Sequence, residues 1–164
     1  MNSNQITLIR ETWPVVAGKA DALTATFYAR LFEIDGDAAK LFAHVDMAAQ
    51  RKKLAQSLAV VVAALDDPDS LLPAISALGK RHTHYGVENH HFDSVGEALL
   101  TALGTTLGAG HTQEIHDAWA DAYALVAAVM RRALVRAGSA HGGSSETTSS
   151  AVATSEKAEH ADMQ

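Results

Sequence analysis

The amino-acid sequence predicts a single all-α domain of about seven or eight helices, followed by a disordered C-terminal tail. Apolar residues recur at helical spacing through the body of the chain. Only three prolines occur in 164 residues, and β-branched residues rarely alternate with polar ones, which disfavours strands. A chain of this length is expected to form one domain with a substantial core.

Breaks between the helices are predicted where glycine, aspartate and proline gather. They fall at Gly18, Asp35-Gly36-Asp37, Asp66-Asp67-Pro68 and Gly108-Ala109-Gly110. Pro14 lies inside the first periodic segment, so we expect a kink or an early end of the helix there. An aromatic cluster of Phe27, Tyr28 and Phe32 marks the second helix.

Three later segments each carry one apolar helix face. Their residues are Leu54, Leu58, Val61, Val62 and Leu65; then Leu99, Leu103 and Leu107; and finally Trp119, Tyr123, Val126, Ala127 and Met130. Thr112 precedes the last segment as a candidate N-cap. Beyond this segment the composition changes sharply.

Residues 138–164 contain twelve Gly, Ser or Thr and no aromatic residue. Such a segment buries too little apolar surface to offset the entropy of ordering it. We therefore expect a domain over residues 1–137 and a disordered tail over residues 138–164.

Composition and charge exclude several classes of protein. Thirteen basic and nineteen acidic residues give a net charge of −6, which argues against nucleic-acid binding. The absence of cysteine excludes disulfides, thiolate metal sites and a cysteine nucleophile. The longest apolar run, residues 54–65, is too short to span a bilayer, and no signal peptide is visible, so we expect a soluble cytoplasmic protein.

Histidine is the residue type that stands out, with four of the nine histidines at His82, His84, His90 and His91. A shared zinc site is one interpretation, but His82 and His84 would point about 200° apart on one helix. Neither cysteine nor a carboxylate at ligand spacing supports such a site. The usual enzyme motifs for nucleotide binding, acyl transfer and zinc proteolysis are also missing.

Three motifs occur in a fixed order along the chain. They are Gly-Lys-Arg-His-x-x-Tyr-Gly-Val at 79–87, Phe-Asp-Ser-Val-Gly-Glu-x-Leu-Leu at 92–100, and Ala-Trp-x-x-x-Tyr at 118–123, with Phe42 upstream. Over about residues 5–135 this layout resembles the globin superfamily, in particular single-domain bacterial haemoglobins, the haem domain of flavohaemoglobins and neuroglobin. The resemblance implies a globin fold around haem b, since no Cys-x-x-Cys-His motif is present for covalent attachment.

By this resemblance His82 matches the proximal histidine, the protein ligand to haem iron. Neutral imidazole is a good iron ligand when its other ring N–H has a fixed acceptor. The carbonyl of Leu78, one helical turn earlier, is the natural acceptor. The alternative for His82 is an ordinary surface histidine.

Further pocket residues follow from the same resemblance. Phe42 matches the phenylalanine that packs flat on the porphyrin, and Val87, Phe92 and Val95 are expected to form the apolar wall beside it. Ordinary core packing is the alternative for all four residues. Lys53, Arg81 and His44 are candidate partners for the two haem propionates, and exposure to solvent is the alternative for each.

Tyr28 and Gln50 match the two positions that face a bound gas in bacterial globins. A phenol O–H and an amide N–H can both donate to the partial negative charge of an oxygen ligand in a dry pocket. Leu54 would then lie above the iron as a steric gate. The alternatives are a core tyrosine for Tyr28 and a solvent-facing helix residue for Gln50.

Three departures from the family pattern affect the expected chemistry. Gly36 replaces the proline usual after the second helix, which would leave that corner less rigid. Phe92 and Leu134 replace the tyrosine and glutamate that push electron density toward the iron in flavohaemoglobins, whereas Tyr123 is kept. This weakens the case for peroxidase-like or reductase-coupled chemistry.

The leading hypothesis is therefore a haem protein that reversibly binds oxygen and other diatomic gases, such as carbon monoxide and nitric oxide, for oxygen transport or storage. An alternative is an enzyme, a nitric-oxide dioxygenase that works with a separate reductase. Gas sensing and a cofactor-free helical interaction module are further alternatives.

Overall fold

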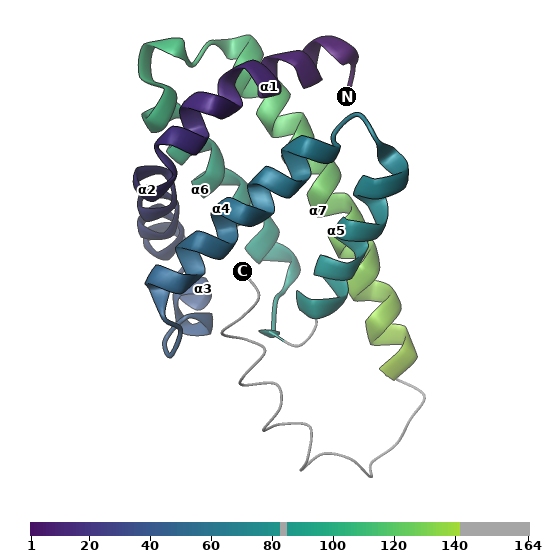
Figure 1. Ribbon diagram of the computed structural model, residues 1–164. Helices are drawn as coiled ribbons and strands as arrows, with labels where there is room; N and C mark the ends of the chain where they lie inside the picture. The colour runs from purple at the N-terminus through teal and green to yellow at the C-terminus, as the bar shows by residue number, and fades with distance from the viewer. Residues whose placement is uncertain (83–84, 142–164) are drawn as a thin grey trace.

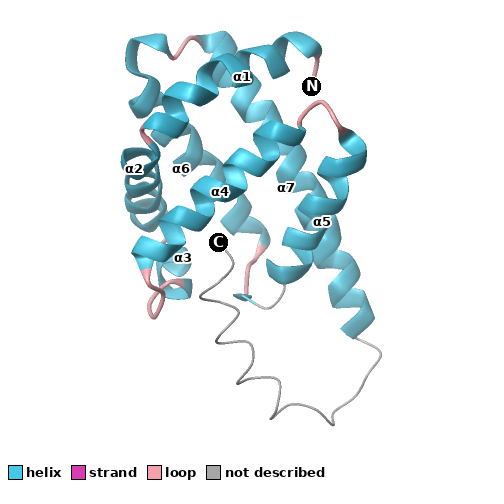
Figure 2. Ribbon diagram, in the orientation of Figure 1, coloured by secondary structure: helices cyan, strands magenta, loops and turns pink. Residues whose placement is uncertain are grey.

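The structure, a computed structural model, describes residues 1–82 and 85–141, and their side chains except those of residue 81 and residues 137–141. These residues form helices α1 (Ser3–Gly18), α2 (Ala20–Ile34), α3 (Gly36–Leu41), α4 (Met47–Ala64), α5 (Pro68–His82), α6 (Asn89–Leu107) and α7 (Gln113–His141), with a short 3₁₀ helix, η2 (Gly108–Gly110). Figures 1 and 2 show only helices and connecting loops among the described residues. The all-α prediction is confirmed.

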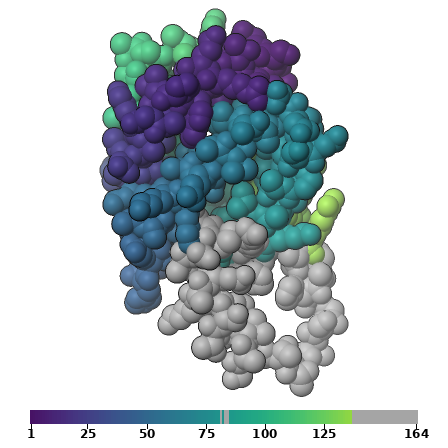
Figure 3. All heavy atoms as spheres, viewed as in Figure 1, coloured from purple at the N-terminus to yellow at the C-terminus, as the bar shows by residue number. Residues whose placement is uncertain are grey.

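The helices pack mainly in two pairs, α2 against α6 and α5 against α7. Helix α1 contacts α6 and α7 from one side, and α4 packs on α1, α2 and α5. In the space-filling view of Figure 3, α1, α4 and α5 form a continuous outer face. The core therefore lies between α4 on one side and α6 and α7 on the other.

The predicted breaks coincide with helix ends, and local hydrogen bonds explain why. Asp35 caps α3 by accepting from the backbone N–H groups of Asp37 and Ala38. Thr112 accepts from the N–H of Ile115 at the start of α7. The corner at Gly36, which we expected to be less rigid, thus has a capping side chain of its own.

The early end of a helix at Pro14 is not observed, because α1 continues to Gly18. The ring removes one backbone donor, but the helix remains docked through Ile9 and Val16, which are fully buried on either side of it. Burial of both turns outweighs the loss of one hydrogen bond.

Two glycines allow the helices around the core to approach closely. A Cβ atom at Gly79 of α5 would lie 2.7 Å from the Cβ of Ala133 on α7. A Cβ atom at Gly96 of α6 would lie 2.7 Å from the ring of Tyr123 on α7. Helix α7 can therefore pack tightly on the ends of α5 and α6 that carry the candidate site residues.

The last helix runs to His141, beyond residue 138 where we placed the start of the tail. The rest of the predicted tail, residues 142–164, lies outside the described residues. Among the described helices, none is both long enough and apolar enough to cross a membrane.

Candidate functional site

A cavity of about 200 Å³ lies inside the helical domain, lined by residues from α2 to α7. Its wall is almost entirely apolar. Seven of the predicted site residues line it: Tyr28, Phe42, Leu54, His82, Val87, Phe92 and Val95. Folding thus brings together residues from five separate segments of the chain, as a binding pocket requires.

His82 is the last residue of α5, and its ring is fixed by a hydrogen bond along the helix. Its Nδ1 lies 2.6 Å from the carbonyl oxygen of Leu78, as expected for residues one turn apart. A carbonyl oxygen only accepts, so Nδ1 carries the proton and the lone pair of the neutral ring is on Nε2. This tautomer is the one that binds a metal through Nε2.

Tyr28 supplies a phenol to the same cavity from α2. Its ring packs edge-on against Phe42, with ring centroids 5.5 Å apart. Burial raises the pKa of the Tyr28 phenol well above its ordinary value, although the hydrogen bond with Gln50 acts in the opposite direction. Tyr28 therefore stays protonated at physiological pH and remains a hydrogen-bond donor.

Gln50 of α4 is fully buried and acts on Tyr28. Its Nε2 donates to the hydroxyl oxygen of Tyr28 at 3.2 Å. Because Tyr28 accepts this bond, its own O–H can donate to a further acceptor. Gln50 is not among the cavity-lining residues of the described chain, so its visible role is to orient the phenol.

Tyr123 and Phe92 both line the cavity, and a hydrogen bond joins them. The Tyr123 hydroxyl donates to the carbonyl oxygen of Phe92 at 2.5 Å. Burial raises the pKa of Tyr123, so this donor is also neutral at physiological pH. Leu134 packs on the core, and the guanidinium of Arg131 lies 5.2 Å from the Phe92 ring.

Two of the charged candidates, His44 and Lys53, are not among the residues that line the cavity. His44 is exposed in the turn between α3 and α4, and Lys53 is half-buried on α4. The side chain of Arg81 lies outside the described residues. The structure therefore leaves their proposed pairing with propionates as a prediction.

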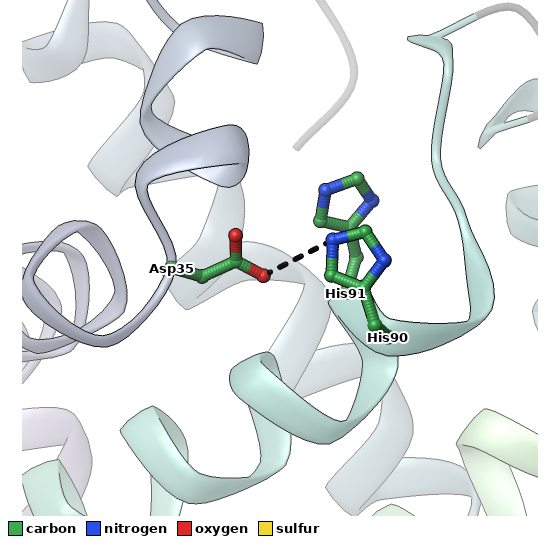
Figure 4. A group of neighbouring side chains, drawn as sticks. All are labelled: Asp35, His90 and His91. Carbon is green, nitrogen blue, oxygen red and sulfur yellow. Dashed lines mark ion pairs between the residues drawn. The ribbon is translucent and has the colours of Figure 1, made fainter.

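Sequence reasoning did not select His91, which lines the cavity from the first turn of α6. Its Nδ1 accepts from the backbone N–H of Glu88 at 2.8 Å. Figure 4 shows the rings of His90 and His91 next to each other beside Asp35. The sequence shows His90 and His91 among its clustered histidines, but it does not indicate that Asp35 lies beside them, because Asp35 is on a distant segment.

The residues present fit a haem group. An apolar cavity suits a flat macrocycle, His82 offers a nitrogen ligand in the required tautomer, and Tyr28 adds a neutral donor. Phe42 and the other apolar residues supply packing surface.

Comparison with known proteins shows which family the chain belongs to. The sequence model of the Globin family matches residues 25–130. A flavohemoprotein of Rhodopirellula baltica is 32% identical over 129 residues, which cover 77% of this chain and 32% of the relative. A flavohemoprotein of Bordetella parapertussis is 33% identical over 141 residues, which cover 83% of this chain and 35% of the relative.

A solved structure has a similar fold. It is an engineered carbene transferase derived from a putative nitric oxide dioxygenase of Rhodothermus marinus, with a TM-score of 0.78 and 26% identity. The match covers 87% of this chain and 99% of that chain. The chain spans about a third of the length of the flavohemoproteins it matches. With the family match, the helical arrangement and the pocket in agreement, this chain belongs to the globin family.

Proposed function

We propose that the protein binds haem b in the cavity and reversibly binds oxygen and other diatomic gases there. The observation that carries this proposal is the convergence of His82 and Tyr28 on one apolar cavity, each with its hydrogen-bonding state fixed by a neighbour. The haem iron, when bound, supplies the coordination position for the gas. Without cysteine in the chain, the haem would be held without a covalent thioether link.

His82 is the proposed axial ligand, and Leu78 is the residue that positions it. The Leu78 carbonyl fixes the tautomer and the ring orientation. This acceptor is neutral, so it increases the basicity of His82 less than a carboxylate would. Leu134 supplies no charge on this side, which favours ligand binding over peroxidase-like chemistry.

Tyr28 is the proposed donor to an oxygen ligand, and Gln50 holds the phenol in place. An oxygen ligand in this cavity would carry partial negative charge and a carbon monoxide ligand much less, so the Tyr28 phenol would favour oxygen. Leu54 lines the same cavity as an apolar gate, and its side chain limits the entry of water.

The haem propionates are proposed to pair with Lys53, Arg81 and His44. Their cationic or hydrogen-bonding side chains suit carboxylates at the solvent edge of a pocket. Val87, Phe92 and Val95 are proposed to pack on the ring, since all three line the cavity.

A second candidate function is nitric-oxide dioxygenation. The similar proteins include flavohemoproteins and a structure described as a putative nitric oxide dioxygenase, which favours this candidate. A separate reductase is the proposed source of electrons for this reaction. Oxygen retained by Tyr28 would be the co-substrate.

The test combines binding and turnover. Purified protein reconstituted with haemin is reduced, and its oxygen binding is followed by absorption, with a prediction of full reversibility. Nitric-oxide consumption is then measured with and without an added ferredoxin reductase. Reversible oxygenation without accelerated nitric-oxide loss supports the binding function, reductase-dependent consumption supports the enzyme, and failure to bind haem excludes both.

A further inference from the structure

We propose that Asp35, His90 and His91 form a binding site for a divalent transition metal ion such as Zn²⁺. The three residues meet where the α2–α3 corner packs on the first turn of α6 (Figure 4). The site does not use His82, but it lies at the edge of the same cavity, where His91 is one of the lining residues. The sequence disfavoured a zinc site near these histidines because the carboxylate comes from a segment 55 residues away.

The distances suit an ion better than a direct hydrogen bond. One ligand atom from each of the three residues lies within 4.8 Å of the other two, and His90 Nε2 lies 3.6 Å from Asp35 Oδ2. Two ligands that each lie about 2.1 Å from a tetrahedral ion are about 3.4 Å apart, whereas an N–H···O hydrogen bond spans about 2.9 Å. The separation between His90 and Asp35 is therefore close to that of two ligands of one ion.

Neighbouring groups hold two of the ligands in the orientation that metal binding needs. His90 Nδ1 lies 3.3 Å from Glu88 Oε2, so this carboxylate can accept a hydrogen bond from Nδ1 when Nε2, on the side of Asp35, binds an ion. Asp35 accepts from Ser94 Oγ at 2.8 Å and from two backbone N–H groups at the start of α3. A carboxylate and a histidine with such partners resemble the ligands of known zinc sites.

His91 provides the independent observation that points to a ligand. It is only 5% exposed, and within the described structure its Nε2 has no hydrogen-bond partner. In Figure 4 the two imidazole rings lie next to each other beside the Asp35 carboxylate; their centroids are 4.0 Å apart and their planes are tilted by 43°. A buried polar atom without a partner is costly, and a metal ion would satisfy it.

Metal binding changes the protonation of His91 in a defined way. Without an ion, Nδ1 accepts from the Glu88 N–H, so the proton of the neutral ring lies on Nε2. With an ion on Nε2, the ring remains neutral by carrying its proton on Nδ1. His91 thus exchanges its hydrogen bond from the Glu88 N–H for a bond to the metal, and the imidazole ring itself stays neutral.

The ligand types select the class of ion. Two imidazoles and one carboxylate suit Zn²⁺, Ni²⁺ or Cu²⁺, whereas Mg²⁺ and Ca²⁺ prefer oxygen ligands alone. Asp37 has a carboxylate oxygen 3.9 Å from His90 Nε2 and can serve as a fourth ligand. The ion would tie the corner between α2 and α3 to α6 at the edge of the cavity.

The test is isothermal titration calorimetry of the purified full chain with ZnCl₂ at pH 7.5. We expect one high-affinity site in the wild type, no binding of MgCl₂, and a higher melting temperature with Zn²⁺. His90→Gln and His91→Gln should each weaken Zn²⁺ binding by more than tenfold, because loss of a group that only orients a ligand already costs about 10- to 100-fold.

His116→Gln is the matched control. His116 belongs to the other close histidine pair, with Nδ1 3.2 Å from His111 Nε2, and its replacement should leave the high-affinity site unchanged. The proposal is overturned if the wild type has no stoichiometric site, in which case the cluster is an ion pair only. It is equally overturned if His91→Gln binds Zn²⁺ as tightly as the wild type, or if His116→Gln removes the site.

Discussion

The substitution Tyr28→Phe removes one hydroxyl from the cavity and keeps the ring that packs against Phe42. In the structure the phenol oxygen already accepts from Gln50, so its proton is the donor offered to a ligand. We predict that the variant loses oxygen faster than the wild type while carbon monoxide leaves at nearly the same rate.

The magnitude follows from the type of hydrogen bond. A bond to a partly charged acceptor contributes about 1.5–3 kcal/mol, which corresponds to oxygen dissociation on the order of 10- to 150-fold faster. The same substitution removes the acceptor of the buried Gln50 amide. The free energy of unfolding should therefore fall by about 1–3 kcal/mol as well.

The assay is stopped-flow displacement of oxygen by carbon monoxide, and of carbon monoxide by nitric oxide, in the reduced haem-bound protein. Gln50→Leu serves as the matched variant: it keeps the phenol but removes its orienting donor, so oxygen should dissociate faster by a smaller factor. Equal acceleration for oxygen and carbon monoxide in Tyr28→Phe would show that the pocket has loosened and that Tyr28 is a packing residue only.

Two further predictions concern stability. Gly79→Ala should lower the free energy of unfolding in urea by about 1–3 kcal/mol, because the new Cβ would lie 2.7 Å from that of Ala133. Gly18→Ala is the control and should not lower it, because a Cβ there has no neighbour within 4 Å. Equal effects of the two substitutions would contradict close packing of α5 on α7. Burial acts to raise the pKa of Asp35, but the hydrogen bond from Ser94 and the other partners lower it overall. The stabilisation by Asp35 is then complete above about pH 4 and is lost as the pH falls through its lowered pKa. The difference in unfolding free energy between wild type and Asp35→Asn should therefore shrink below about pH 4. A difference that grows there would contradict a lowered pKa for Asp35.

The parts of the site that could be predicted from sequence are those set by local helix geometry or by the matched motifs. The contact between His82 and the Leu78 carbonyl follows from a four-residue separation on a helix. The resemblance assigned both Tyr28 and Phe42 to the pocket, and both residues line the cavity. The spacing of apolar residues likewise indicated which helix faces are buried.

The parts that could not be predicted depend on pairs distant in sequence or on backbone acceptors. Gln50 was expected to face the ligand, but whether its amide points to the cavity or to Tyr28 depends on how α4 packs on α2. Tyr123 donates to the backbone carbonyl of Phe92, and a backbone acceptor leaves no trace in the residue type. The approach of Asp35 to His91 needs the full fold.

The measurement that tests the central claim most directly is a haemin titration of the purified protein, followed by the absorption spectrum of the ferrous form. We predict one haem per chain and a spectrum typical of histidine ligation in the wild type and in His116→Ala. His82→Ala should lose stable haem binding or give a ferrous spectrum without a histidine ligand. Unchanged haem binding and an unchanged ferrous spectrum in His82→Ala would contradict the account.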